Sequence, residues 1–157
     1  KGLQLQPSVD YAEARDIDIL VIPGGYGQYE LMSHEPTIQF LQKIYPQTKF
    51  LMTVCTGTLL AGVAGLLEGY KATTHWTSHH LLGYLGITPV KERYVVDRNV
   101  VSTAGVTGGI DGALIRFCIR NISCTERDGS LSWFFKAGNH SKSCSFTATR
   151  WSKECKE

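Results

Sequence analysis

The stretch KFLMTVCTGTLLAGVAGLL, Lys49–Leu67, decides the fold because its hydrophobic period changes abruptly at one cysteine. Before Cys55, the apolar run Phe50–Val54 predicts a buried strand. After Cys55, small residues are followed by leucines and valines at helical intervals, which predict a helix. A strand that turns sharply into a helix lifts the side chain of the turn residue out of the sheet edge, beside unpaired helix N–H groups.

A thiol at this turn is a candidate nucleophile. The helix N-terminus carries partial positive charge, which favours thiolate over thiol, and the thiolate is the reactive form. The backbone N–H of Thr56 could also face an oxyanion. The alternative is that Cys55 only packs, because free cysteine is among the most buried residue types. The spacing alone leaves both interpretations open.

Composition and charge exclude some classes of protein. The 157 residues are 43% hydrophobic and 19% charged, which predicts one globular domain with a real core. The formal net charge is +2, but residues 1–120 contain ten Lys or Arg and ten Asp or Glu, so the excess lies after them. A body without net charge has no field that attracts nucleic acid. We therefore expect no nucleic-acid partner.

Cysteine usage indicates the compartment. Five cysteines, an odd number without a C-x-x-C pair, argue against a disulfide framework and for a reducing compartment. No apolar run approaches the ~20 residues that a membrane span needs. The start KGLQLQPS has neither an apolar signal core nor a Met. We expect a cytoplasmic protein without a membrane partner, and we interpret the chain as a fragment or an incomplete gene product.

Strands and helices alternate along the chain, which predicts a doubly wound α/β sandwich. The first strand ends in Pro23–Gly27, whose glycines allow positive φ and close backbone approach at the edge where α/β sheets bind ligands. Pro36 suits the first turn of a helix, and Pro46 ends it. The expected strands are 17–22, 49–54, 71–74, 93–97 and 100–102, and the last two form a hairpin around Arg98-Asn99. The expected helices are 36–45, one after Cys55 that ends at Glu68, 78–85 and 110–119.

The character of the sequence changes after Arg120. This part holds three of the five cysteines and seven serines, and no period of 2 or 3.6 is sustained. We expect residues 120–157 to form an irregular, disordered tail. The sequons at Asn121 and Asn139 occur without a signal peptide, so we interpret them as chance. We expect no metal site, because the spacing fits no usual zinc motif for Cys124, His140, Cys144 and Cys155.

Four short motifs converge on one edge of the predicted sheet. Carboxyl ends of parallel strands meet at the same edge, so the residues that follow them lie together. His75 follows Cys55 by one helix and one strand, which returns it to that edge, where it either orients or protonates a substrate or is a structural histidine beside Trp76. The motifs are Gly24-Gly25, Cys55-Thr56, His75 and Gly105.

The segments IPGGYG, VCTGTLLAGVAGLLEGYKATTHW and VVSTAGVTGGID resemble the ThiJ/PfpI superfamily, flavodoxin-like relatives of class I glutamine amidotransferases, and most resemble its isonitrile hydratase type. The resemblance covers residues 1–119 and implies a flavodoxin-like domain that lacks its first strands. It leaves 120–157 as a tail outside the family pattern.

The resemblance also implies roles for individual residues. Cys55 would be the nucleophile, and Thr56 would contribute its N–H and hydroxyl. Gly25 would give the second oxyanion N–H, and His75 would assist near the thiol. In such hydratases the thiolate attacks an isocyanide carbon, an acid protonates the adduct, and water releases a formamide. The substrate is a small molecule, no metal or organic cofactor is needed, and Gly24, Gly25 and Gly105 would bind the substrate.

One departure from the family pattern affects the activity. The family's acidic partner follows the first strand of the fold, and this sequence begins with what resembles a later segment, so the chain looks truncated at its N-terminus. Asp10, Asp18 and Glu30 are the remaining nearby carboxylates, and none matches the family position. We therefore expect this chain to be an impaired hydratase.

Other functions remain open at this point. The domain also resembles the ligand-sensing half of some transcription regulators, although no helix-turn-helix follows residue 120. A truncated product without catalysis, a glyoxalase and a redox sensor are further alternatives, and a homodimer is compatible with the resemblance. The substrate itself is not readable from the sequence.

Overall fold

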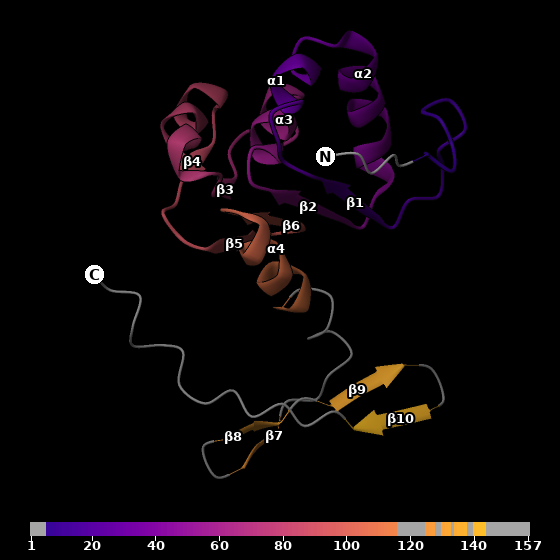
Figure 1. The fold of residues 1–157 in the computed structure, drawn as a ribbon, viewed down its shortest axis with the longest axis vertical. Helices are drawn as coiled ribbons and strands as arrows, with labels where there is room; N and C mark the ends of the chain where they lie inside the picture. The colour runs from indigo at the N-terminus through magenta and orange to yellow at the C-terminus, as the bar shows by residue number, and fades with distance from the viewer. Residues whose placement is uncertain (1–5, 116–124, 128–129, 133, 138–139, 144–157) are drawn as a thin grey trace. The chain divides into compact units, whose positions relative to one another are not determined.

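The computed structural model describes residues 6–115 and, further along, 125–127, 130–132, 134–137 and 140–143. The chain divides into two units, Lys1–Gly112 and Ala113–Glu157. The first unit is built on a four-stranded sheet in the order β1-β2-β6-β5 (Figure 1). The strands are β1 (Ile19–Ile22), β2 (Phe50–Val54), β5 (Tyr94–Asp97) and β6 (Val100–Thr103).

The pairing register brings the ends of three strands to one edge. β1, β2 and β6 are parallel, with Ile22 opposite Thr53 and Val54 opposite Thr103. β5 runs antiparallel to β6 and closes the predicted hairpin. The residues that follow β1, β2 and β6 therefore start from the same edge, as the sequence predicted.

Helices cover the sheet from both sides (Figure 1). On one side lie α1 (Gln28–Leu31), α2 (Glu35–Ile44) and α3 (Gly57–Val63). Their apolar residues pack with those of the strands, and the main core contains Leu20, Ile22, Leu41, Ile44, Leu51, Leu59, Leu60 and Leu67. On the other side, α4 (Val106–Ala113) crosses so closely that a Cβ on Gly112 would lie 3.1 Å from Val101 Cγ1.

The α/β class and most of the predicted elements are confirmed, but some boundaries and one helix type are wrong. The strands predicted at 17–22 and 71–74 are shorter, at Ile19–Ile22 and Lys71–Ala72. The helix after Cys55 ends at Val63 instead of Glu68, and Gly65 has φ +76° in the turns that follow. The last helix begins at Val106, four residues before Ile110. The segment Trp76–Leu85 is a 3₁₀ helix that ends at Gly86 in the left-handed conformation.

Several short helices and strands were not predicted from the sequence. α1 covers only four residues, and β3 (Lys71–Ala72) pairs in parallel with β4 (Thr88–Pro89) as a separate two-stranded sheet. The 3₁₀ turn Tyr45–Gln47 follows α2 directly. Segments of two to four residues are too short to show a hydrophobic period, so the sequence gives no signal for them.

The second unit contains regular structure where the sequence predicted an irregular tail. β7 (Thr125–Arg127) pairs antiparallel with β8 (Ser130–Ser132), and β9 (Phe134–Ala137) pairs antiparallel with β10 (His140–Ser143). That expectation is therefore wrong for these strands. The division at residue 119 and the expected disorder stay predictions, and Cys124, Cys144, Cys155 and both sequon asparagines lie outside the described residues.

A polar cluster fixes the edge of the sheet opposite the motifs. The Tyr45 and Tyr70 hydroxyls lie 3.2 Å apart, and Tyr70 donates to Asn99 Oδ1 at 3.3 Å. The Arg98 guanidinium lies 3.4 Å from the centre of the Tyr70 ring. These contacts tie the end of α2 to the turn between β5 and β6, so they stabilise the frame that carries the functional edge.

The cluster predicts a loss of stability at alkaline pH. Burial and then the hydrogen bond to Tyr70 raise the pKa of Tyr45 from 10.0 to about 12. The unfolded chain releases this proton first, so the contribution of Tyr45 to stability is complete below pH 10.0 and is lost as the pH rises through about 12. Urea unfolding between these pH values should show a shallower decline for Tyr45→Phe than for the parent chain. If the free energy of unfolding fell equally with pH in the parent chain and in Tyr45→Phe, the raised pKa of Tyr45 would not be the cause.

Candidate active site

Cys55 stands at a strained turn between β2 and α3. Its φ of +56° is a left-handed conformation that non-glycine residues rarely adopt. Its N–H donates to the Thr103 carbonyl at 2.9 Å, and its carbonyl accepts a hydrogen bond from Thr74 Oγ1 at 2.8 Å. The surrounding strands therefore hold a conformation that costs about 1–2 kcal/mol. The thiol is partly exposed, so the turn presents it instead of packing it away.

Two glycines allow the backbones of β1 and α3 to meet beneath the turn. A Cβ on Gly24 would lie 2.6 Å from Cys55 Cβ and 2.8 Å from the Val54 carbonyl oxygen. A Cβ on Gly57 would collide with the Ile22 carbonyl oxygen and lie 2.7 Å from that of Pro23. No side chain fits at either position, so the loop after β1 lies directly against the thiol-bearing turn.

Thr56 connects this loop to the turn through its hydroxyl. Thr56 Oγ1 accepts the Gly25 N–H at 3.0 Å and lies 3.3 Å from the Gly25 carbonyl oxygen, to which it donates. Gly25 has φ +130°, which suits glycine alone. The Gly25 N–H, expected to face an oxyanion, thus already has an acceptor, whereas no hydrogen bond is found from the Thr56 N–H to any described residue.

A network of buried hydroxyls under the turn was missed from the sequence. Thr53 Oγ1 and Thr58 Oγ1 lie 2.8 Å apart, and Thr58 donates to the Thr73 carbonyl at 2.9 Å. The Thr73 N–H donates to Ser102 Oγ at 2.9 Å. All four residues are buried, so the network fixes β2, α3, β3 and β6 relative to one another. The repeated threonines at strand ends were the available signal.

His75 follows Thr74 but is not bonded to the thiol. Its Nδ1 lies 2.7 Å from Thr77 Oγ1, and its ring is tilted against Trp76 at 5.7 Å between centres. No hydrogen bond joins His75 to Cys55 in the part of the chain that the structure describes. The segment nevertheless reaches the turn, because the neighbouring Thr74 binds the Cys55 carbonyl.

Gly105 belongs to the third loop at this edge. It follows Thr103, whose carbonyl accepts the Cys55 N–H, and its own carbonyl accepts the Gly109 N–H at 2.8 Å as α4 begins. A Cβ on Gly105 would meet open space. The structure thus joins Gly24, Gly25, Cys55 and Thr56 directly and brings the loops of His75 and Gly105 to the same edge.

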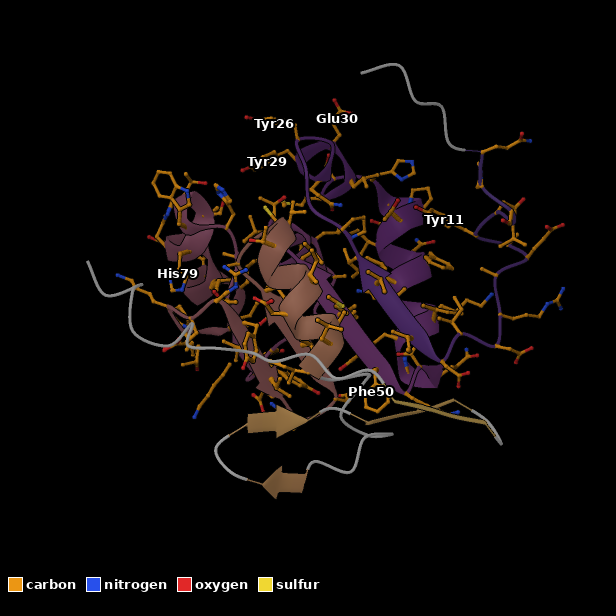
Figure 2. All side chains as sticks on the ribbon, turned by 60° about the horizontal axis from the view of Figure 1, so that its bottom comes forward. Tyr11, Tyr26, Tyr29, Glu30, Phe50 and His79 are labelled. Atoms are coloured by element: carbon orange, nitrogen blue, oxygen red, sulfur yellow. The ribbon has the colours of Figure 1, made fainter. Side chains whose placement is uncertain are left out.

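The three candidate carboxylates lie away from the thiol or in solvent. Asp18 pairs with Lys49 at 2.6 Å at the start of β1 and β2, the opposite edge of the sheet. Asp10 Oδ1 accepts two N–H groups of its own turn. Glu30 is exposed on α1; Figure 2 shows it near Tyr26 and Tyr29 at one end of the sheet, with Phe50 at the other. Among described residues, no carboxylate hydrogen-bonds to Cys55.

Two further properties of the described residues concern metal binding and membrane spanning. Across residues 6–115, no group of three His, Cys, Asp or Glu side chains is placed to hold a metal ion. No helix in the described part of the chain is both long enough and apolar enough to cross a membrane.

Comparison with known proteins gives consistent matches over the first unit. A model of the DJ-1/PfpI family matches residues 1–115. The isonitrile hydratase of Pseudomonas putida is 45% identical over 113 residues, which cover 72% of this chain and 50% of that protein. The HTH-type transcriptional regulator GbdR of Pseudomonas aeruginosa is 30% identical over 112 residues, which cover 70% of this chain and 30% of the regulator. The chain spans half or less of these relatives.

A solved structure agrees with these matches. The crystal structure of a THiJ/PfpI family protein from Pseudomonas syringae superimposes with a TM-score of 0.70 at 39% identity. The superposition covers 73% of this chain and 48% of that one. The flavodoxin-like fold predicted from the sequence is thereby confirmed.

Proposed function

The chain belongs to the DJ-1/PfpI family, and from this premise we propose that it adds water to an isocyanide to give an N-substituted formamide, with Cys55 as the nucleophile. The observation that carries the proposal is the conformation of Cys55. A partly exposed thiol is held at φ +56° by hydrogen bonds from two neighbouring segments. The similarity to an isonitrile hydratase over the same residues supports this substrate class.

The chemistry needs no redox step. The Cys55 sulfur attacks the isocyanide carbon, a C–S bond forms, and a proton transferred to that carbon completes a thioimidate. Water then adds to the same carbon, and the C–S bond breaks as the nitrogen takes up a proton. The products are the N-substituted formamide and the free thiol, so atoms balance with one water consumed.

Hydrogen-bond donors beside the sulfur would stabilise the hydrated adduct. The Thr56 N–H is available for its oxygen, because no acceptor for this group is found among the described residues. The Gly25 N–H becomes available only when the Thr56 hydroxyl turns away from it. We propose that Gly24 and Gly105 give the substrate access, since neither brings a side chain to the edge.

The source of the protons limits the rate. A positioned acid is typically worth about 10²–10⁴-fold, and Asp10, Asp18 and Glu30 do not contact the thiol. The His75 ring is bonded to Thr77 through Nδ1, and among the described residues no hydrogen bond joins it to Cys55. Solvent water can protonate the strongly basic carbon of the adduct, whereas hydrolysis of the neutral thioimidate depends on a positioned proton donor. We therefore propose that this chain forms the thioimidate and releases the formamide slowly.

Formamide production from cyclohexyl isocyanide, followed by chromatography, tests the proposal. We expect about one equivalent of isocyanide to be consumed per chain, followed by slow formamide release. Rapid turnover by this chain would show that another group, such as His75, already supplies the proton. Absence of both isocyanide consumption and formamide would contradict the proposed function.

A ligand-sensing role is the second candidate, and the similarity to the regulator GbdR favours it. A sensor binds its ligand without consuming it. Recovery of unchanged isocyanide from a saturable complex, with Cys55 unmodified, would support this role over catalysis.

A further inference from the structure

Three loops meet at the Cys55 turn, and each is tied to it by a hydrogen bond. The loop after β1 is held by the Gly25 N–H on Thr56 Oγ1 at 3.0 Å. The loop after β3 is held by Thr74 Oγ1 on the Cys55 carbonyl at 2.8 Å. The loop after β6 follows Thr103, which accepts the Cys55 N–H at 2.9 Å. The residues immediately after these three anchors therefore lie on loops at the same edge of the sheet as the Cys55 turn.

Each loop exposes a large apolar side chain within three residues of its anchor. Tyr26 is 94% exposed, Trp76 is 79% exposed and Val106 is 78% exposed. Single exposed apolar residues are normal on a protein surface, but here three of them stand on loops that are anchored to one turn. Tyr29, on the short helix after Tyr26, is 51% exposed, and Figure 2 shows it near Tyr26.

These loops carry no formal charge. The segments 23–27, 74–78 and 104–109 contain no Lys, Arg, Asp or Glu. An anionic substituent brought to this edge would lose water without meeting a Lys or Arg from these loops, and the exposed Glu30 near Tyr26 and Tyr29 would repel it (Figure 2). An apolar substituent would instead gain by removing its own surface and the exposed rings from water.

We propose that Tyr26, Trp76 and Val106 form an apolar clamp for the substituent on the isocyanide nitrogen. The inference rests on the proposed function and defines its substrate class: isocyanides with a bulky, uncharged aliphatic or aromatic substituent, preferred over those with a small or an anionic one. The reactive carbon lies at Cys55, and the substituent points outward between the three loops. The clamp selects substrates through contact area and takes no part in bond making.

The test compares how fast cyclohexyl, methyl and carboxymethyl isocyanide modify Cys55, followed by intact mass. Each rate is divided by the rate with free N-acetylcysteine, which removes intrinsic reactivity. We expect the cyclohexyl compound to be favoured over the others by about 10-fold or more, the scale of discrimination by apolar pockets. Tyr26→Ala and Trp76→Ala should each lower the cyclohexyl-to-methyl ratio severalfold.

Tyr84→Ala is the matched control. Tyr84 is 86% exposed but lies near the other end of the 3₁₀ helix that begins at Trp76, about 16 Å along its axis at 2 Å per residue. This variant should leave the ratio unchanged. Equal ratios in the parent chain and the Tyr26 and Trp76 variants would overturn the clamp. The clamp would also be overturned if Tyr84→Ala lowered the cyclohexyl-to-methyl ratio as much as Tyr26→Ala and Trp76→Ala do.

A second probe separates the clamp from the proposed reaction. N-benzylmaleimide and N-methylmaleimide alkylate thiols by the same addition and differ mainly in their apolar substituent. A benzyl preference lost in Trp76→Ala, together with no modification by any isocyanide, would refute the proposed function while supporting an apolar clamp at Cys55. Isocyanide adducts with no substituent preference would support the function and refute the clamp.

Discussion

Replacing Cys55 by alanine should abolish covalent reaction with isocyanides, lowering the rate of consumption by more than about 10³-fold, the scale of losing a catalytic nucleophile. The reason is that Cys55 carries the one thiol that the structure describes at the strand-to-helix turn. Mass spectrometry of the treated variant should find no added isocyanide. Cys55→Ser is the matched control for shape, since it keeps the side-chain size and should also be inactive because a hydroxyl is a far weaker nucleophile.

The left-handed conformation of Cys55 should also lower the stability of the folded chain. Cys55→Ala and Cys55→Gly both lack the thiol and differ only by a Cβ at φ +56°. We expect the glycine variant to be more stable than the alanine variant by about 1 kcal/mol, because glycine adopts this conformation without strain. Urea unfolding of both variants measures the difference. An alanine variant that equals or exceeds the glycine variant would mean that the turn is not strained.

Gly57→Ala should be strongly destabilising, by about 2–3 kcal/mol. The new Cβ would collide with the carbonyl oxygen of Ile22 and approach that of Pro23 to 2.7 Å, and both are backbone atoms that cannot rotate away. The loop after β1 would have to move from the turn, so isocyanide modification of Cys55 should slow as well. Thermal or urea unfolding and intact mass measure the two effects.

Gly27→Ala is the control for this substitution. A Cβ on Gly27 would meet nothing within 4 Å, and its φ of −61° suits any residue. This variant should stay within about 0.5 kcal/mol of the parent chain. If Gly57→Ala and Gly27→Ala lowered stability equally, the effect of Gly57→Ala would not come from the close backbone contacts beneath the turn.

The fold was predictable where the sequence carries a long signal. The run Phe50–Val54 and the leucines after Cys55 gave the central strand and its helix, and the Arg98–Asn99 turn gave the hairpin of β5 and β6. Boundaries were less predictable, since α3 ends at Val63 although apolar spacing continues to Leu67. Leu66 and Leu67 remain buried in turns, because burial requires only that a side chain reach the core.

Within the candidate site, the sequence indicated which residue types would be present but not how their side chains would be oriented. The glycines of Pro23–Gly27 indicated close backbone approach, and the structure shows it at Gly24; the similar approach at Gly57 was not predicted. His75 was expected near the thiol, but its ring binds Thr77 and the neighbouring Thr74 contacts the turn instead. Which of two adjacent side chains faces a site depends on the pleat and on local hydrogen bonds, which spacing alone does not give.

Identifying the atom that an isocyanide modifies tests the role of Cys55 most sharply. The purified chain is treated with cyclohexyl isocyanide, digested, and mapped by tandem mass spectrometry. We expect one added isocyanide on the peptide that contains Cys55, and none on the peptides with Cys118, Cys124, Cys144 or Cys155. Modification spread evenly over all five cysteines, or confined to another one, would contradict the claim that the strained turn makes Cys55 the nucleophile.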